Sequence, residues 1–297
     1  MSISSLARKF LPESTVTSIA RASKRMRRAR IERLPVLTEE CFAGILSRDL
    51  GLVSGDTVYI HSSTDQLNLG FPFYRILSLV QEIIGAQGTV LLPTYPNRRP
   101  VSSHEYLLRN VVFDVRRTPS YTGLLSEFAR RQKSALRSLH PTKSVCAIGP
   151  RAKELTATHQ QSPYPYDTGS PYYKLIEYNA KIIGLGVWTQ YLTFVYCVDD
   201  ALKDQAPVQT YFPEKFSARC VNYDGKEEVV ETYAHDMRRV VHDVPQFMKD
   251  HIPEEVCRDL VIDGMKFFTA DAARLFGLML PLAKDGITVY PRSVYRK

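Results

Sequence analysis

Hydrophobic and polar positions follow two rhythms along the chain, one typical of helices and the other of buried strands. Where apolar residues recur every three or four positions, as at Ile76, Leu79 and Val80, one helix face is expected to be buried. This spacing predicts helices over 14–34, 38–50, 73–84, 122–131, 151–158 and 172–178. Short, continuous apolar runs predict buried strands over 57–61, 88–93, 144–148 and 181–187. Because strand and helix alternate, we expect an α/β fold, an α/β/α sandwich around a mostly parallel mixed sheet.

Beyond about Ala206 the pattern changes to strand-like alternation, broken by the turn signal Asp224-Gly225, which predicts an antiparallel hairpin. Later segments are expected to form helices over 235–250 and 270–283 and strands near 260–262 and 287–290. The stretch from Pro96 to Pro119 reads as a long loop without regular structure, and such loops are often functional. We therefore expect a helical extension over 1–35 and one domain over 36–297 that carries a C-terminal antiparallel appendage.

Charge is concentrated at the N-terminus. The net charge is +8, and residues 1–35 contribute +7 of it from nine basic and two acidic residues, so the rest of the chain is nearly neutral. A basic helix over 14–34 either contacts an anionic membrane or another acidic partner, or is simply a solvated surface. It holds no aromatic residue to stack on bases, so no nucleic-acid partner is expected.

Several chemistries lack their sequence motifs. The five cysteines form no CxxC pair, which argues against a disulfide framework and against a zinc ribbon. The chain also lacks a phosphate-binding GxxxxGK[ST], a GxSxG nucleophile turn and an HExxH zinc motif, so no metal is expected. The first residues lack the apolar core of a secretory signal, and no apolar run is long enough to cross a bilayer, so we expect a cytoplasmic protein.

Polar residues follow several of the predicted strands, where ligands bind in open α/β sheets. The segment 137–171 adds two histidines, His140 and His159, each next to a proline-rich turn. The candidate site residues chosen on these grounds are His61, Ser62, Ser63, Thr94, Ser120, Glu127, Arg137, Ser138, His140, His159, Thr193 and Asp199.

Six segments, taken in order, resemble the aminoglycoside 3-N-acetyltransferase family, also called antibiotic acetyltransferases. They are GDTVYIHSS (55–63), GTVLLPTY (88–95), FDVRRTPSYTGLLSE (113–127), RSLHPTKSVCAIGPRA (137–152), TGSPYYKL (168–175) and the helix that follows Thr193. The resemblance covers about Leu37 to Ala201 and implies a single α/β/α domain, unrelated to the GNAT acetyltransferases. It also implies an N-acetyltransferase that uses acetyl-CoA as the acyl donor and an amino sugar as the acceptor.

The resemblance also implies roles for individual residues. The residues expected to hold coenzyme A are His61, Ser62, Ser63, Thr94, Ser120, Gly123, Arg137, Ser138, His140 and Thr142. His159 is similar to the catalytic base, a role that suits a neutral imidazole because an amine must lose a proton before it attacks a thioester. We expect Asp199, or as second choice Glu127, to supply an acidic group near the substrate. Thr193 or backbone N–H groups would stabilise the oxyanion.

Each of these residues also has a structural interpretation. His140 could cap the turn at Pro141, and His159 could interact with the dipole of a preceding helix. Asp199 lies beside Asp200 and could belong to a solvated helix face, and Glu127 could be an ordinary exposed helix residue.

The chain departs from the family in the segment that should face the acceptor. Aminoglycoside-modifying members tend to have two histidines and a glutamate after the conserved threonine, where this chain has Tyr196, Cys197 and Asp199. This favours a different acceptor, an amino sugar precursor of a surface polysaccharide or a secondary metabolite rather than an aminoglycoside. The identity of the acyl group stays open. The alternative function is a non-catalytic binding module of the same fold that contacts an anionic surface or partner through residues 1–35.

Overall fold

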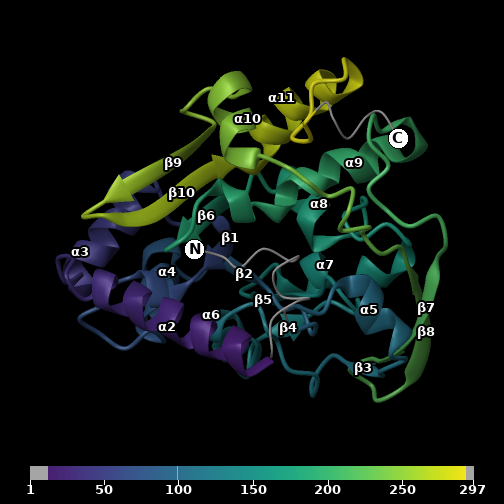
Figure 1. Cartoon of the computed structure of the whole chain (residues 1–297), viewed down its shortest axis with the longest axis horizontal. Coiled ribbons are helices and arrows are strands. Elements are labelled where there is room, and N and C mark those ends of the chain that lie inside the picture. Colours follow the sequence, from purple (N-terminus) through teal and green to yellow (C-terminus); the bar gives the residue numbers. More distant parts are fainter. Residues whose placement is uncertain (1–12, 99, 292–297) are drawn as a thin grey trace.

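A seven-stranded sheet forms the centre of the protein (Figure 1). The structure, a computed structural model, describes residues 13–98 and 100–291. The strand order is β4-β5-β2-β1-β6-β10-β9. The strands are β1 (Thr57–Ser62), β2 (Thr89–Pro93), β4 (Leu136–Arg137), β5 (Val145–Ile148), β6 (Lys181–Leu185), β9 (Cys257–Ile262) and β10 (Met265–Asp271).

The strand pairing confirms a mostly parallel mixed sheet. β1 pairs in parallel with β2 and with β6, while β5 runs antiparallel to both β2 and β4. On the other side β10 runs antiparallel to both β6 and β9. Five strands therefore share one direction, and β5 and β10 oppose it. As a consequence, β4, β2, β1 and β6 all end at one edge of the sheet, which we call the carboxyl edge.

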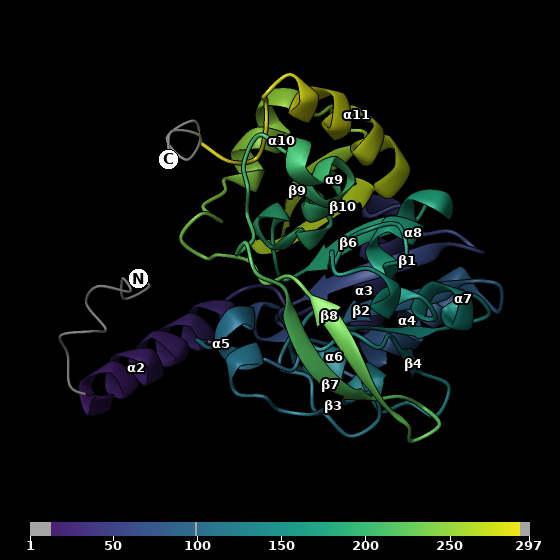
Figure 2. The same cartoon turned by 90° about the vertical axis from the view of Figure 1, so that its right-hand side faces the viewer.

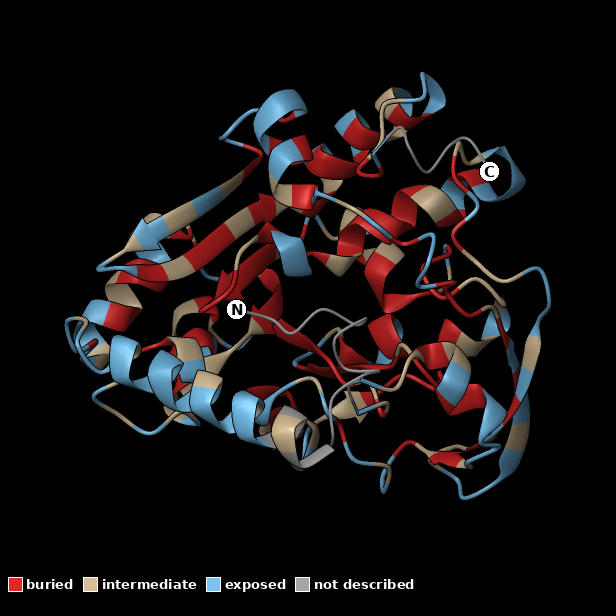
Figure 3. Ribbon diagram, in the orientation of Figure 1, coloured by how far each residue is buried: buried red, intermediate tan, exposed pale blue. Residues whose placement is uncertain are grey.

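Helices cover both faces of the sheet, as the alternation predicted. Successive strand residues point to opposite faces, so Val58 and Ile60 lie in one hydrophobic cluster and Tyr59 lies in the other. The first cluster includes residues of α3 (Glu39–Gly44), α4 (Arg75–Ile84) and α6 (Leu124–Arg130). The second includes α7 (Ala152–Thr156), α8 (Pro171–Glu177), α9 (Tyr196–Leu202), α10 (Val244–His251) and α11 (Ala272–Lys284). Buried residues follow the strands, while exposed ones gather on the outer helix faces (Figure 3).

Short helical turns connect these elements. They are the π-helical turn η1 (Ile45–Asp49) and the 3₁₀ turns η2 (Thr64–Gln66), η3 (His159–Gln161), η4 (Thr189–Tyr191), η5 (Thr193–Val195) and η6 (Lys203–Gln205).

A second, three-stranded sheet lies beside the main one (Figure 2). Its strands β7 (Phe216–Val221) and β8 (Glu227–Thr232) form the antiparallel hairpin predicted around Asp224-Gly225. The third strand, β3 (Phe113–Asp114), pairs in parallel with β7. The prediction of an unstructured loop over 96–119 is therefore wrong, because this stretch holds β3 and also α5 (Ser103–Leu108). Ser102 and Glu105 start α5 with a capping box, a signal readable in the sequence.

The C-terminal region differs most from its prediction. The expected strand at 287–290 is not formed, and the helix expected over 235–250 is only α10. Strand β10 was missed, although Asp263-Gly264 marks the two-residue turn that joins it to β9. Both turn residues have positive φ, 50° and 77°, as such a turn requires.

The basic helix α2 (Glu13–Ile31) projects from the rest of the molecule (Figure 2). Two of its apolar side chains are exposed: Ile19 is 39% exposed and Met26 is 73% exposed. Arg27 forms a 3.8 Å ion pair with Asp65 of η2. Residues 1–12 of the predicted extension lie outside the described residues, so its boundary stays a prediction. Within residues 13–98 and 100–291, no helix combines the length and apolar character needed to cross a bilayer.

Two glycines fix the end of β6 against its neighbours. A Cβ at Gly184 would overlap the ring of Phe268 on β10. Gly186 has φ +73°, and a Cβ there would overlap the carbonyl oxygen of Ser63, which follows β1. Only glycine permits both this backbone conformation and this close approach.

We predict that Gly186→Ala lowers the free energy of unfolding by more than about 1 kcal/mol, because the left-handed backbone and the contact with Ser63 both oppose a side chain. The matched control is Gly277→Ala in α11, where a Cβ meets no atom within 4 Å. That variant should gain about 0.5–1 kcal/mol. Denaturant unfolding measures both, and equal stability of Gly186→Ala and the wild type would contradict the prediction.

Candidate active site

The carboxyl edge brings together residues that the sequence placed after separate strands. Ser62 and Ser63 follow β1, Thr94 follows β2 and Ser138 follows β4. The Ser63 N–H donates to the carbonyl of Leu185 at 2.9 Å, and the Thr94 N–H donates to the carbonyl of Ser144 at 2.8 Å. These bonds tie the end of β1 to the end of β6, and the end of β2 to the start of β5.

The loop before α6 closes onto this edge. The Thr122 hydroxyl donates to the Pro93 carbonyl at 2.5 Å, and Ser120 Oγ bonds to Thr122 Oγ1 at 2.8 Å. Gly123, the residue before α6, has φ +136° and lies against the Ser62 carbonyl. The segment expected to bind coenzyme A over 118–123 therefore lies beside Ser62 and Ser63.

Arg137 is hydrogen-bonded to the loops that follow β2, β3 and β4 at the carboxyl edge. Its side chain is buried and donates to the carbonyls of Thr94 and Thr118 and to the hydroxyls of Thr94 and Ser144. The guanidinium also lies 4.6 Å from the ring centre of Phe113. Burial lowers its pKa to about 10, so it stays charged at neutral pH. With these partners, Arg137 positions the binding loops.

His140 caps a turn. Its Nδ1 accepts hydrogen bonds from the backbone N–H groups of Thr142 and Lys143, at 3.2 and 3.0 Å. Nε2 then carries the proton and donates to Thr232 Oγ1 at 3.2 Å. The ring is fully buried. These bonds match the structural interpretation of His140, and they also fix Thr142 within the turn.

His159 lies on η3 with both ring nitrogens engaged. Nε2 donates to the Pro165 carbonyl at 2.8 Å, since a carbonyl only accepts, and Nδ1 accepts from Ser138 Oγ at 2.8 Å. The side chain is 1% exposed, and burial lowers its pKa to about 3, so the ring is neutral. The partner of Nε2 is therefore the backbone carbonyl of Pro165. In this arrangement both ring nitrogens of His159 are hydrogen-bonded within the protein, so neither has a lone pair available to take a proton from an acceptor substrate.

Glu127 is engaged with arginines. Its carboxylate accepts from the Ser120 N–H and pairs with Arg130 and Arg131 at 2.7 Å. Burial opposes its ionisation, but the bonds from Arg130, Ser120 and Arg131 lower its pKa to about 2. Glu127 is therefore ionised at neutral pH. Its bond to the Ser120 N–H holds the 118–123 loop, and we assign it no part in proton transfer.

A group of buried aromatic side chains packs on the face of the sheet that α8 and α9 cover. The ring of Tyr59 lies 4.8 Å from His61 and 5.7 Å from Tyr172, and Tyr172 lies 4.5 Å from Tyr166. Tyr166 in turn lies 5.2 Å from Tyr196 on α9. We call this group the aromatic wall, and it consists of Tyr59, His61, Tyr166, Tyr172, Tyr196 and His235.

Several buried polar atoms of the wall lack hydrogen bonds. Among the described residues, no partner of good geometry reaches the hydroxyls of Tyr59, Tyr166 and Thr193 or the Nε2 atoms of His61 and His235. An unpaired buried polar atom is costly. A ligand that forms hydrogen bonds with these atoms would remove that cost, so its binding would be favoured here. We therefore take the aromatic wall and Thr193 as the candidate substrate site.

Two carboxyl groups lie on α9 behind the wall. Asp199 is partly exposed and accepts a hydrogen bond from the Tyr290 hydroxyl, and burial raises its pKa to about 7. Asp200 is fully buried and accepts from the Tyr166 N–H and the Tyr211 hydroxyl. The alternative interpretation, in which Asp199 and Asp200 belong to a solvated helix face, therefore does not describe either residue. Thr193, Tyr196 and Asp199 follow one another at three-residue spacing, which puts them on one side of the η5–α9 segment.

Sequence reasoning missed most of the wall. Tyr59 and Tyr172 lie within the segments 55–63 and 168–175 that carry the resemblance, whereas Tyr166 and His235 lie in loops outside those segments. The high tyrosine content, 17 residues, does not say where these side chains meet.

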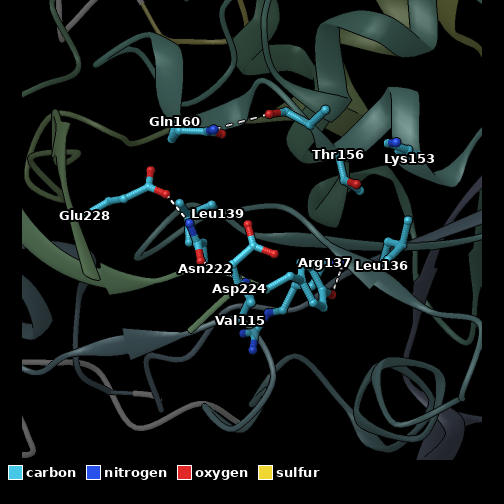
Figure 4. Close-up of a pocket in the computed structure, with 12 residues that line it drawn as sticks. Val115, Leu136, Arg137, Leu139, Lys153, Thr156, Gln160, Asn222, Asp224 and Glu228 are labelled. Carbon is cyan, nitrogen blue, oxygen red and sulfur yellow. Dashed lines mark hydrogen bonds between the residues drawn. The ribbon is translucent and has the colours of Figure 1, made fainter. Parts of the chain in front are cut away.

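A pocket of about 350 Å³ lies on the other side of Arg137, between α7 and the β7–β8 hairpin (Figure 4). Leu139 and Gln160, the neighbours of the two site histidines, line it together with Lys153, Asp224 and Glu228. Its charges are of both signs, and of the predicted site residues only Arg137 contributes to its lining. In the part of the chain that the structure describes, no group of three or more His, Cys, Asp or Glu is placed to hold a metal ion.

Asp199 should make stability depend on pH. Its pKa in the folded protein lies above 3.8, the ordinary value for an aspartate, so the folded state binds this proton more tightly than the unfolded chain does. The resulting stabilisation is complete below about pH 4 and is lost as the pH rises through 7. Asp199→Asn cannot ionise, so relative to the wild type it should gain about 2 kcal/mol in unfolding free energy between pH 5 and pH 8.

Denaturant unfolding at several pH values measures this difference. Asp285→Asn, at an exposed position after α11, is the matched control and should run parallel to the wild type. Parallel curves for Asp199→Asn would show that the Asp199 pKa is not raised.

Comparison with known proteins agrees with this geometry. A family model described as aminoglycoside 3-N-acetyltransferase matches residues 60–279. The chain is 28% identical over 160 residues to aminoglycoside N(3)-acetyltransferase IX of Micromonospora chalcea, which is 50% of this chain and 57% of that protein. It is 25% identical over 215 residues to aminoglycoside N(3)-acetyltransferase III of Serratia marcescens, which covers 62% of this chain and 80% of that protein. The chain thus spans little more than half the length of the first of these relatives.

Solved structures show the same fold. The structure of AAC-IIIb with CoASH superposes with a TM-score of 0.67 at 20% identity, covering 86% of this chain and all of that one. AAC(3)-Xa gives a TM-score of 0.70 at 18% identity, covering 91% of this chain and 99% of that one. AAC-VIa bound to sisomicin gives 0.67 at 22% identity, covering 85% and 98%.

Proposed function

The chain belongs to the aminoglycoside 3-N-acetyltransferase family, and on that basis we propose that it transfers the acetyl group of acetyl-coenzyme A to an amine of an amino sugar. The observation that carries the proposal is the Thr193 hydroxyl, which has no hydrogen bond of good geometry and shares one side of η5–α9 with the Asp199 carboxyl. A thioester needs a donor for its developing oxyanion, and an ammonium needs a carboxylate.

We place the donor along the carboxyl edge. Ser62 and Ser63 end β1, and the 120–123 loop lies beside them, so the hydroxyl and backbone groups of both segments suit the amides of a pantetheine arm. A relative in this family was solved with CoASH, which supports this donor. The loops are kept in place by hydrogen bonds from Arg137 to Thr118, from Ser120 to Glu127 and from Lys143 to His140. His159 holds Ser138 in the same way.

The acceptor would lie against the aromatic wall. An amino sugar presents an ammonium group and apolar ring faces, and the wall offers tyrosine rings beside the carboxyl of Asp199. All named relatives are aminoglycoside enzymes, and one was solved with sisomicin. The departures at Tyr196, Cys197 and Asp199 and the small net charge outside residues 1–35 favour an amino sugar with fewer charges, such as a polysaccharide or secondary-metabolite precursor.

The alternative is a binding protein that contacts an anionic membrane or another acidic partner through α2. The observation in its favour is that α2 exposes Ile19 and Met26 as well as its arginines. Such a protein has no reason to bind acetyl-CoA.

The proposal is tested by thiol release from acetyl-CoA with a panel of amino sugars, nucleotide-linked amino sugars and aminoglycosides. We expect turnover with at least one amino sugar and a higher kcat/KM for acceptors with one or two amines than for aminoglycosides. Calorimetry with acetyl-CoA runs beside the assay. Absence of both binding and turnover would contradict the proposal and favour the binding protein.

A variant of Thr193 serves as the internal control. Thr193→Val keeps the shape of the side chain and removes the hydroxyl, so acetyl-CoA should still bind while kcat falls by about 10²-fold. Unchanged kcat would show that Thr193 does not contact the oxyanion.

A further inference from the structure

A pantetheine arm along Ser62, Ser63 and the 120–123 loop leaves the phosphate groups of coenzyme A without an assigned partner. Those groups, a diphosphate and a 3′-phosphate, are anionic and pair best with arginine and lysine. Arg137 lies at this edge, but it is buried and its donors bond to neighbouring loops. Cations for the phosphates are therefore expected on the surface around Ser63.

The basic helix α2 reaches this surface through Arg27. The Ser63 hydroxyl donates to Asp65 Oδ1 at 2.6 Å, and Asp65 Oδ2 lies 3.8 Å from Nη1 of Arg27. Asp65 belongs to η2, the turn that follows β1, and α2 contacts η2. A short series of contacts thus joins a hydroxyl of the proposed donor site to a cation of α2.

Arg27 keeps donors for a phosphate. Its side chain and that of Asp65 are both 51% exposed, and 3.8 Å is long for a salt bridge, so this pair is weak. A guanidinium has five N–H donors, and a phosphate accepts two of them at once at a shorter distance. A phosphate that approaches Ser63 from solvent would therefore pair with Arg27 more strongly than Asp65 does.

Lys24 and Arg30 extend this basic side of α2. They lie three positions before and three positions after Arg27, and residues three apart share one side of a helix. With a rise of about 1.5 Å per residue, the three cations are spread over about 9 Å of the helix axis. Both side chains are exposed, and within residues 13–98 and 100–291 neither forms an ion pair. Such a row suits a ligand whose phosphates are separated.

We infer that Lys24, Arg27 and Arg30 bind the phosphate groups of coenzyme A, with the diphosphate nearest to Arg27 and Ser63. This inference rests on the proposed acetyl transfer. The family model begins its match at residue 60, so α2 lies outside the matched part. Residues 1–35 carry +7 of the net charge of +8, so this region is also the main electrostatic attraction for an anionic donor.

The experiment compares two triple variants that remove equal charge from different sides of α2. The first combines Lys24→Gln, Arg27→Gln and Arg30→Gln. The control, on another side of the helix, combines Arg21→Gln, Arg25→Gln and Arg28→Gln. Glutamine is a good helix former, so both should keep α2. Calorimetry should show the Kd for acetyl-CoA raised about 10- to 100-fold in the first variant, because each exposed charge pair contributes roughly two- to fivefold. The control should change by less than about threefold, because exposed charges that are not in contact are screened.

A donor without phosphates separates charge recognition from folding. S-acetylpantetheine has the same thioester and no phosphate, so its kcat/KM should be equal in the two triple variants. Raising the salt concentration should weaken acetyl-CoA binding by the wild type more than binding by the first variant, since fewer ion pairs are left to screen.

The outcomes separate this inference from the proposed function. A wild-type Kd for acetyl-CoA in the first variant, or an equal rise in both variants, would overturn the inference and leave the acetyl transfer intact. A loss of kcat/KM with S-acetylpantetheine in the first variant alone would also overturn it, because the effect would then be structural. A wild-type protein that binds no acetyl-CoA would overturn both.

Discussion

A buried guanidinium holds the carboxyl edge of this sheet together. Arg137 is 3% exposed, and its donors reach the loops that follow β2, β3 and β4. A buried cation is tolerable only when its donors are satisfied, so these loops cannot move independently of it. The remaining bonds of the segment act in the same way: His140 ties its own turn, and Ser138 joins His159 to the start of β5. The segment that resembles the family most closely is thus a rigid support.

The polar groups of this support are already hydrogen-bonded to one another, so in the proposed function the reaction takes place on the opposite side of the site. Thr193, Tyr196 and Asp199 share one side of η5–α9, and their neighbours are the aromatic wall, Tyr290 and His242. This side supplies a hydroxyl without a hydrogen bond of good geometry, a hydrogen-bonded phenol and a carboxyl whose pKa is near neutral. The donor side is built from backbone and hydroxyl groups of the strand ends.

The central strands and their helices could be predicted, because TVYIH, GTVLLP and KIIGLGV are buried on both faces and carry the pattern in their own residues. Strand β10 was missed since MKFFTAD alternates only weakly, and its pairing with β6 is a tertiary contact. The position of the candidate residues at strand ends could be predicted too, since it follows from the topology. Roles were harder: His140 and His159 differ from surface histidines only through partners such as Thr232 and Pro165, which no local pattern reveals.

The most direct test of this account is a crystal structure of the protein with coenzyme A. We predict that the pantetheine arm lies along Ser62, Ser63 and the 120–123 loop, with its sulfur within about 4 Å of Thr193 Oγ1, a van der Waals contact. The sulfur should also lie on the same side as Tyr196. A pantetheine arm that instead enters the pocket between α7 and the β7–β8 hairpin, with the sulfur away from Thr193, would contradict it.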